Sequence, residues 1–226
     1  DLGRELSVQD AHTLLGQAIA GGASDGQAVH DAIHQMIVES PEYAARNAPV
    51  DGPAPTTPDL EGMAAKSPVF YQYNPPGSAA YYNGSSNCGP TSAAEIAVAL
   101  GVGANADPRA LIMQFHDAMG TTEDGTSVSG ISSGLRAMGI NTETVWSPSL
   151  ADVDSELAQG RYMVANGDYY GMRGSGPIGT AGHFVAVVGK DASGNYIVND
   201  PADPSRAPLH ITGDQLMNFF RTHQGG

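Results

Sequence analysis

The sequence predicts an α+β fold in which helices pack on an antiparallel sheet, preceded by a helical hairpin at the N-terminus. Three observations support this prediction. Apolar residues recur at helical spacing in several segments between 88 and 158. Two strand-like segments, 183–188 and 196–200, are separated by turn residues that are typical of a β-hairpin. Two further amphipathic stripes precede a Pro-rich stretch near the start of the chain.

Residues 1–47 are expected to form the helical hairpin extension. A first stripe runs from Val8 to Ile19 and stops at Gly21-Gly22, and Asp25 then opens a second helix. That helix carries His30 and His34 four residues apart, but without a neighbouring Glu or a third ligand we predict no metal site. Two helices alone bury little surface, so the hairpin should rest on a larger domain or serve a partner or inhibitory contact.

Residues 48–65 contain four prolines and no hydrophobic periodicity, which indicates an extended, semi-rigid linker. Residues 66–226 are therefore predicted to form the main domain. It should begin with a short strand or extended piece around Val69–Tyr73 and continue with a helix after Cys88.

Further elements of the domain follow from caps and periodicity. Helices are expected from Pro108, from about Val128 to Gly139 and from Ser149 or Leu150 to Ala158, with a strand over 140–146. His116, in the helix from Pro108, has no expected role. A strand over 161–165 should lead into a Gly-rich connection over 166–180, which we expect to border a substrate cleft. The strands 183–188 and 196–200 and a helix after Asp214 complete the domain.

The net charge and composition argue against several kinds of partner, and the sequence motifs indicate no cofactor. The formal charge of −14, from 24 acidic and 10 basic residues, argues against nucleic acid and anionic membranes. No apolar run approaches the roughly 20 residues of a membrane span. The many Gly, Ala, Asp and Ser residues and the low Lys content favour a secreted bacterial protein or effector. We see no cofactor motif.

Cys88, the only cysteine, lies where a polar loop becomes an apolar helix. Apolar residues follow it at helical spacing up to Leu100, so Cys88 should occupy the first turn of a buried helix. A helix N-terminus favours thiolate, and a neighbouring imidazolium can lower the pKa of a thiol to roughly 3–4. Such a cysteine is a candidate nucleophile, although a free cysteine is more often a small core residue.

A histidine and an acceptor for it are found far downstream. His183 is the one titratable residue of an apolar strand, and the hairpin brings Asn199 or Asp200 near its end of the sheet. Upstream of Cys88, the side-chain amide of Gln72 could donate a hydrogen bond to an oxyanion formed at the cysteine, with Asn83 and Asn87 as alternative donors. The strand register decides which of Asn199 and Asp200 faces the imidazole.

These motifs resemble those of the double-glycine, or bacteriocin-processing, peptidase-like family of the papain-like cysteine peptidases. The matching residues cover about 68–221 and are Gln72, Cys88-Gly89-Pro90-Thr91-Ser92-Ala93, Gly182-His183-Phe184-Val185-Ala186-Val187-Val188-Gly189 and Asn199-Asp200-Pro201. The resemblance implies a papain-like catalytic domain over 66–226. It also implies a Cys88, His183 and Asp200 triad, with Gln72 in the oxyanion hole and Asn199 as the alternative orienting residue.

The resemblance implies a thiol-dependent hydrolase that cuts a peptide or amide bond of a peptide or protein through a thioester. Two other interpretations stay open. The same Cys88 and His183 pair would serve a glutamine deamidase or transamidase, because that reaction uses the same intermediate. An inactive peptidase-like binding module would lack a member of the triad, and none is missing from the sequence.

Overall fold

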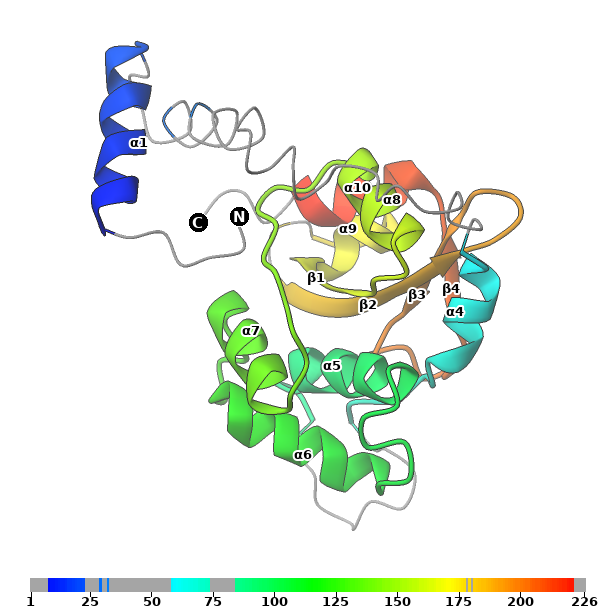
Figure 1. The fold of residues 1–226 in the computed structure, drawn as a ribbon. Coiled ribbons are helices and arrows are strands. Elements are labelled where there is room, and N and C mark those ends of the chain that lie inside the picture. Colours follow the sequence, from blue (N-terminus) through cyan, green and yellow to red (C-terminus); the bar gives the residue numbers. More distant parts are fainter. Residues whose placement is uncertain are drawn as a thin grey trace. The chain divides into compact units, whose positions relative to one another are not determined.

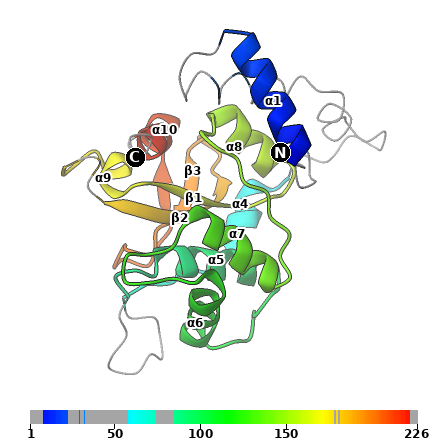
Figure 2. The same ribbon diagram turned by 90° about the vertical axis from the view of Figure 1, so that its left-hand side faces the viewer.

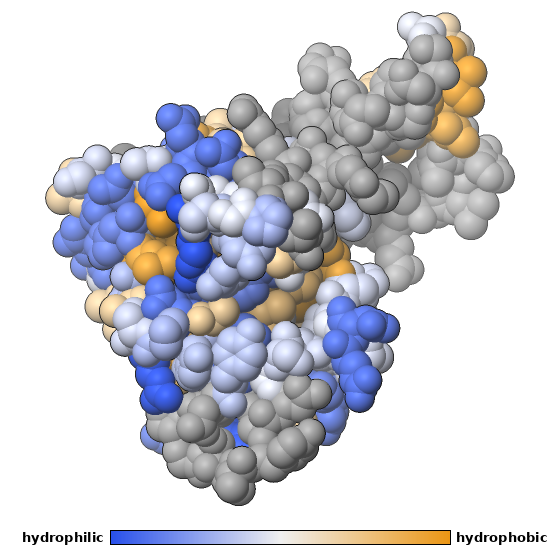
Figure 3. Space-filling model, turned by 180° about the vertical axis from the view of Figure 1, so that it is seen from behind, coloured by the Kyte–Doolittle hydropathy of each residue, from blue (hydrophilic) through white to orange (hydrophobic). Residues whose placement is uncertain are grey.

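The computed structural model describes residues 8–22, 29, 32, 58–73, 84–177, 179 and 181–221. The chain divides into two compact units, Asp1–Pro55 with Glu143–Val145, and Thr56–Thr142 with Trp146–Gly226. In the first unit, helix α1 spans Val8–Ala20. Its Leu15 and Ile19 are exposed by 41% and 56%, and Figure 3 shows apolar residues along one side of this helix. The second helix of the predicted hairpin, His30 and His34, and the linker up to residue 57 lie outside the described residues.

The second unit contains a four-stranded sheet in the order β1-β2-β3-β4. The strands are β1 (Met163–Asp168), β2 (Gly182–Lys190), β3 (Tyr196–Asn199) and β4 (Leu209–Ile211). All neighbouring strands pair antiparallel, and the pairing of β2 with β3 is the hairpin that the turn after Lys190 predicts. The α+β class with an antiparallel sheet is thereby confirmed.

Strand β2 forms the centre of the core because both of its faces are covered. Val185 and Val187 point to one face and pack with residues of α8 (Leu150–Ala158) and α10 (Gly213–Arg221). Phe184 points to the other face and packs with α5 (Cys88–Ala99), α6 (Pro108–Met119) and α7 (Val128–Ala137). Figures 1 and 2 show the sheet lying between these two groups of helices. The alternation of side chains along β2 therefore produces a three-layered core.

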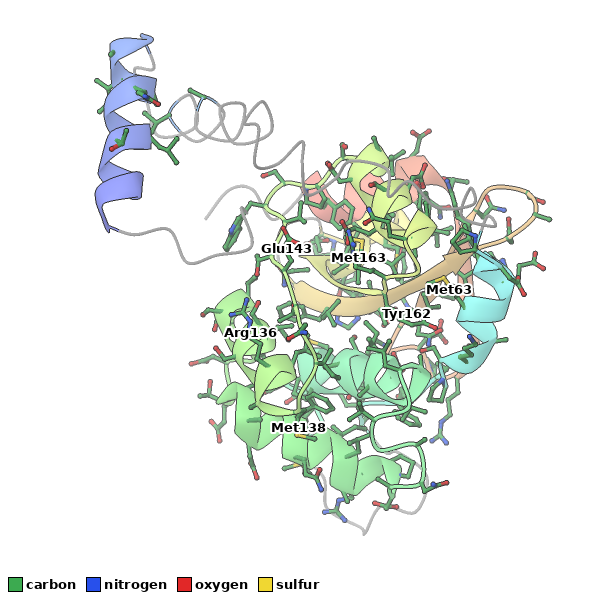
Figure 4. The ribbon with its side chains drawn as sticks, in the orientation of Figure 1. Met63, Arg136, Met138, Glu143, Tyr162 and Met163 are labelled. Atoms are coloured by element: carbon green, nitrogen blue, oxygen red, sulfur yellow. The ribbon has the colours of Figure 1, made fainter. Side chains whose placement is uncertain are left out.

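Helix α4 (Leu60–Lys66) corrects the prediction that residues up to 65 are extended linker. Asp59 caps this helix through Gly62, and Met63 and Ala64 are buried. Gly189 of β2 lies against the Leu60 carbonyl, where a Cβ would collide with it, and the Tyr162 hydroxyl donates to the Met63 carbonyl at 3.1 Å (Figure 4). Tight packing on the sheet thus stabilises a seven-residue helix that periodicity alone does not reveal.

Two other predicted elements differ in the structure. Residues 140–146 do not join the sheet, and the reason lies in burial: Ile140 is buried, whereas Trp146 at the other end is 61% exposed. Alternating residues favour a strand only where one face of the strand packs against other residues, and this segment becomes exposed toward its end. The expected connection 166–180 begins instead as the rest of β1 and then helix α9 (Tyr169–Arg173), which Asp168 caps.

Candidate active site

Cys88 begins helix α5, and most of this helix is buried. Phe115 and Ile131 of the next two helices belong to the same apolar cluster as Cys88, so the first turn is held on its outer side. A Cβ on Gly89 would lie 2.7 Å from Ile131 Cδ1, which explains the glycine next to the cysteine. The position of Cys88 at the loop-to-helix transition agrees with the sequence prediction.

The residue before Cys88 is held by the neighbouring helix. Asn87 is the N-cap of α5, but its side chain makes no capping hydrogen bond. Its Oδ1 instead lies 2.7 Å from His116 Nδ1 on α6, and Asn87 is 1% exposed. His116 thus helps to fix the loop that leads to Cys88. Sequence spacing did not reveal this contact because the two residues lie far apart in the chain.

His183 is the second residue of β2 and is 5% exposed. Its Nε2 lies 2.7 Å from Asp200 Oδ1, and its ring also hydrogen-bonds to the Cys88 thiol. The edge-on ring of Tyr169 lies 5.3 Å from the imidazole, between ring centroids. One imidazole therefore contacts both the thiol and the carboxylate.

The pKa values of this pair favour a charged thiolate and imidazolium. Burial lowers the pKa of His183, but hydrogen bonds to Asp200 and Cys88 and their charges outweigh it and raise the pKa to about 9. Burial raises the pKa of Cys88, but the hydrogen bond to His183, its charge and the backbone N–H groups of Phe184 and Gly89 hold it below its ordinary 9.0. At neutral pH the imidazole thus keeps its proton beside the sulfur.

Asp200 follows β3 and is fully buried. Its Oδ1 also accepts from the backbone of Ala202 at 2.9 Å, and its Oδ2 lies 2.5 Å from Arg173 Nη2. Burial raises the pKa of Asp200, but the hydrogen bond and charge of His183, followed by the charge of Arg173, hold the pKa below its ordinary 3.8. Asp200 is therefore an anion between two cations.

Arg173 comes from the end of α9 and packs 4.2 Å from the ring centroid of Tyr169. Asp168 fixes this part of the chain, because its Oδ1 accepts from the backbone of Tyr170 and Gly171 and its Oδ2 accepts from Gly179 at 2.7 Å. Sequence analysis located this Gly-rich segment beside the site but did not identify either residue. The only signal was two charged residues within it.

Asn199 and Asp200 have different positions despite being adjacent. The Asn199 side chain donates from Nδ2 to Ser67 Oγ and to the Pro68 carbonyl, each at 3.0 Å. The imidazole of His183 faces Asp200 instead.

Gln72 is 2% exposed and lies beside the loop that leads to Cys88. Its Nε2 donates to the Gly84 carbonyl at 2.8 Å, and its backbone N–H donates to the Pro201 carbonyl at 2.9 Å. A Cβ on Gly84 would collide with the backbone of Gln72 and Tyr73, so the glycine permits this close approach. Of the alternatives, Asn87 is bonded to His116, and Asn83 lies outside the described residues.

A helix-borne cysteine that faces a histidine and a carboxylate on an antiparallel sheet defines the class of papain-like cysteine peptidases. Comparison with known families then places the chain: it belongs to the Peptidase_C39 like family, which matches residues 65–222. This family is double-glycine peptidase-like, as the motifs predicted, and it implies a peptide substrate. Neither the curated proteins nor the solved structures contain a match to the chain. Among the described residues, no helix is long and apolar enough to cross a membrane.

Proposed function

We propose that the protein is a thiol-dependent hydrolase that cuts a peptide or amide bond with Cys88, His183 and Asp200. The observation that supports this proposal best is the imidazole of His183, which bonds to the Cys88 thiol and lies 2.7 Å from Asp200. Because Asp200 engages Nε2, the nitrogen Nδ1 remains for the thiol and the substrate.

In the first half of the reaction, the Cys88 thiolate attacks the substrate carbonyl carbon and forms a carbon–sulfur bond. The His183 imidazolium then gives its proton to the leaving nitrogen, the carbon–nitrogen bond breaks, and a thioester remains. In the second half, neutral His183 takes a proton from water as the water oxygen attacks the thioester. The acyl product leaves as a carboxylic acid, and Cys88 returns to thiolate. Asp200 orients the imidazole and stabilises its charged form.

The oxyanion that forms on the carbonyl needs two donors, which we assign to the Cys88 backbone N–H and the Gln72 amide. Gln72 Nε2 donates to the Gly84 carbonyl at 2.8 Å and, over a longer distance of 3.5 Å, to the Ser85 carbonyl. The oxyanion would replace the Ser85 carbonyl as the acceptor of the second hydrogen. Removing one oxyanion donor typically costs about 10²–10³ in kcat. Asn199 bonds to Ser67 and Pro68, which supports Asp200 as the orienting residue.

The first test is intact-mass spectrometry after iodoacetamide treatment between pH 4 and 8. We expect Cys88 to alkylate rapidly below pH 7 and His183→Ala to abolish that rapid reaction. His210→Ala is the matched control, since His210 also lies in a strand and 2.7 Å from an aspartate, Asp191, but is exposed. Slow alkylation of Cys88 at every pH in the folded wild type would contradict the thiolate–imidazolium pair.

The second test identifies the reaction. A peptide library incubated with wild type and with Cys88→Ala is analysed by mass spectrometry for new termini. Cleavage by the wild type alone supports the hydrolase. A mass increase of about 1 Da at glutamine, with release of ammonia and no cleavage, would instead identify a deamidase, which uses the same thioester. If Cys88 is reactive but the library shows neither cleavage nor a mass increase at glutamine, a binding module would be favoured.

Secretion from a bacterial cell and a partner or inhibitory contact through residues 1–47 belong to the same proposal. The composition supports the former, and the exposed Leu15 and Ile19 of α1 support the latter.

A further inference from the structure

The segment Ser67–Gln72 is tied on two sides. On one side, the Ser67 hydroxyl donates to the Glu95 carbonyl at 3.3 Å, and the Phe70 N–H donates to Glu95 Oε1 at 2.7 Å. On the other side, Asn199 donates to Ser67 and Pro68, and the Gln72 N–H donates to the Pro201 carbonyl. The segment therefore connects the helix of Cys88 with the chain that carries Asp200.

Glu95 is an unusual residue for its place. It lies on α5, two turns after Cys88, is 0% exposed, and has Ala and Ile as its sequence neighbours in the helix. Burial raises the pKa of Glu95 well above its ordinary 4.5, the Phe70 N–H opposes this, and the charge of Asp200 adds to it. Burial thus favours the neutral form of the carboxyl, whose Oε1 accepts from the Phe70 N–H.

A buried carboxyl at this position carries a cost that a leucine would avoid, because Oε2 has no hydrogen-bond partner among the described residues. The hydrogen bond that its side chain does make is with the backbone N–H of Phe70, two residues before Gln72 in the chain. An apolar side chain would fill the space but would leave the Phe70 N–H without this partner. The carboxyl is therefore better explained by the position of the segment than by packing.

We propose that Glu95 is a positioning residue that, through the Phe70 N–H, holds the segment Ser67–Gln72 so that the Gln72 amide reaches the oxyanion formed at Cys88. This inference rests on the proposed thiol mechanism. No hydrogen bond among the described residues joins Glu95 to Cys88, His183 or Asp200, so its hydrogen bond to Phe70 is the route to Gln72. The thiolate–imidazolium pair, which depends on His183 and Asp200, does not require it.

The test compares Glu95→Leu, Glu95→Gln and Gln72→Ala in the full chain, with the peptide cleavage assay of the proposed function. Glutamine retains a carbonyl oxygen that can accept from Phe70, whereas leucine does not. We expect kcat of Glu95→Leu to fall at least tenfold, with KM changed less than threefold, and kcat of Glu95→Gln to stay within threefold of wild type. The loss should be smaller than that of Gln72→Ala, for which about 10²–10³ is expected.

Ser92→Ala is the matched control. Ser92 lies on the same helix and is 0% exposed, and its hydroxyl has no hydrogen-bond partner among the described residues. A general sensitivity of α5 to core substitutions would lower kcat in this variant too and would contradict the inference. We expect its kcat to equal that of the wild type.

Iodoacetamide alkylation of Cys88 distinguishes a failure of the positioning role of Glu95 from a failure of the thiol mechanism. Rapid alkylation below pH 7 in Glu95→Leu, together with the lower kcat, supports a role through Gln72. Wild-type kcat in Glu95→Leu, or an equal loss in Glu95→Gln, would overturn the role of Glu95 and leave the thiol mechanism intact. Cleavage by Cys88→Ala would overturn the mechanism itself.

Ser67→Ala covers the case in which Glu95→Leu does not fold. This change removes the ties from Ser67 to the Glu95 carbonyl and from Asn199 to Ser67 but leaves the core volume almost unchanged. We expect a lower kcat with unchanged alkylation of Cys88. Full kcat in folded Ser67→Ala would overturn the inference.

Discussion

Arg173 Nη2 and Asp200 Oδ2 form an ion pair at 2.5 Å on the side of the carboxylate that faces away from His183. Arg173 is 22% exposed at its side chain, whereas the Asp200 side chain is fully buried. The carboxylate beside the imidazole is therefore held from a second direction, by a residue of α9 rather than of the sheet.

Replacing Arg173 by Met should move the pH profile of kcat/KM upward. Loss of a nearby positive charge makes deprotonation harder for Asp200, Cys88 and His183, so both limbs shift to higher pH, by about half to one unit. Arg173→Lys should shift less. The control is Arg161→Met, which removes a partly exposed ion pair with Glu156. An unshifted profile with a lower maximum would show that Arg173 acts through geometry rather than charge.

The wild-type pH profile itself should fall on the alkaline side near pH 9. The pKa of His183 is raised from 6.5 to about 9, so the imidazolium that protonates the leaving nitrogen is lost only above that pH. The stability that this raised pKa contributes is full below 6.5 and disappears as the pH passes about 9. Kinetics and denaturant unfolding across pH 6 to 10 measure both; an alkaline limb near pH 6.5 would contradict the pairing with Asp200.

Glu95→Gln should stabilise the protein, and more so at higher pH. The pKa of Glu95 is raised in the folded state, so the folded chain holds a proton that the unfolded chain releases above about 4.5. Wild-type stability therefore falls, relative to the glutamine variant, as pH rises above 4.5, by at most about 1.4 kcal/mol per pH unit. Urea unfolding at pH 4, 6 and 8 tests this, and a constant difference would indicate an ionised, paired Glu95.

Asp168→Asn should loosen the segment that carries Tyr169 and Arg173. Burial opposes ionisation of Asp168, but backbone N–H groups, of which Gly171 and Gly179 contribute most, hold its pKa below 3.8. An asparagine cannot accept at both oxygens, so one buried N–H loses its partner at a cost of about 1–3 kcal/mol. The wild-type advantage should be present above pH 3.8 and vanish as the pH falls through the lowered pKa.

Thermal unfolding and kcat/KM measure the effect of Asp168→Asn. Asp214→Asn is the control, because Asp214 is exposed in the first turn of α10 and such surface changes cost within about 0.5 kcal/mol. Equal melting temperatures for the two variants would show that the Asp168 carboxylate does not hold the segment.

The long helices and the central strands of the second unit could be predicted from sequence because each shows its own periodicity or cap. Asp107 before Pro108 and Ser149 before Leu150 mark two helix starts, and both residues accept from the helix N-terminus as expected. Helices α4 and α9, of seven and five residues, were missed. Such short helices contain too few turns to display a stripe, and contacts with the sheet stabilise them.

The residues Cys88, His183 and Asp200 of the candidate site could likewise be singled out, because they lie next to distinctive turns and strands. Their supporting residues could not. The bonds of Arg173 to Asp200, His116 to Asn87 and Glu95 to Phe70 join elements far apart in the chain. Strand register and helix packing determine such contacts, and local periodicity predicts neither of them.

The dependence of Cys88 on His183 has a consequence for synthesis of the chain. The thiol emerges from the ribosome long before β2, the strand whose histidine lowers its pKa. Until the sheet docks on α5, the nascent chain carries an ordinary cysteine, mostly protonated at neutral pH and slow to react. Under the proposed mechanism, tertiary assembly is thus the step that produces the reactive thiolate, so the growing chain does not hydrolyse its neighbours.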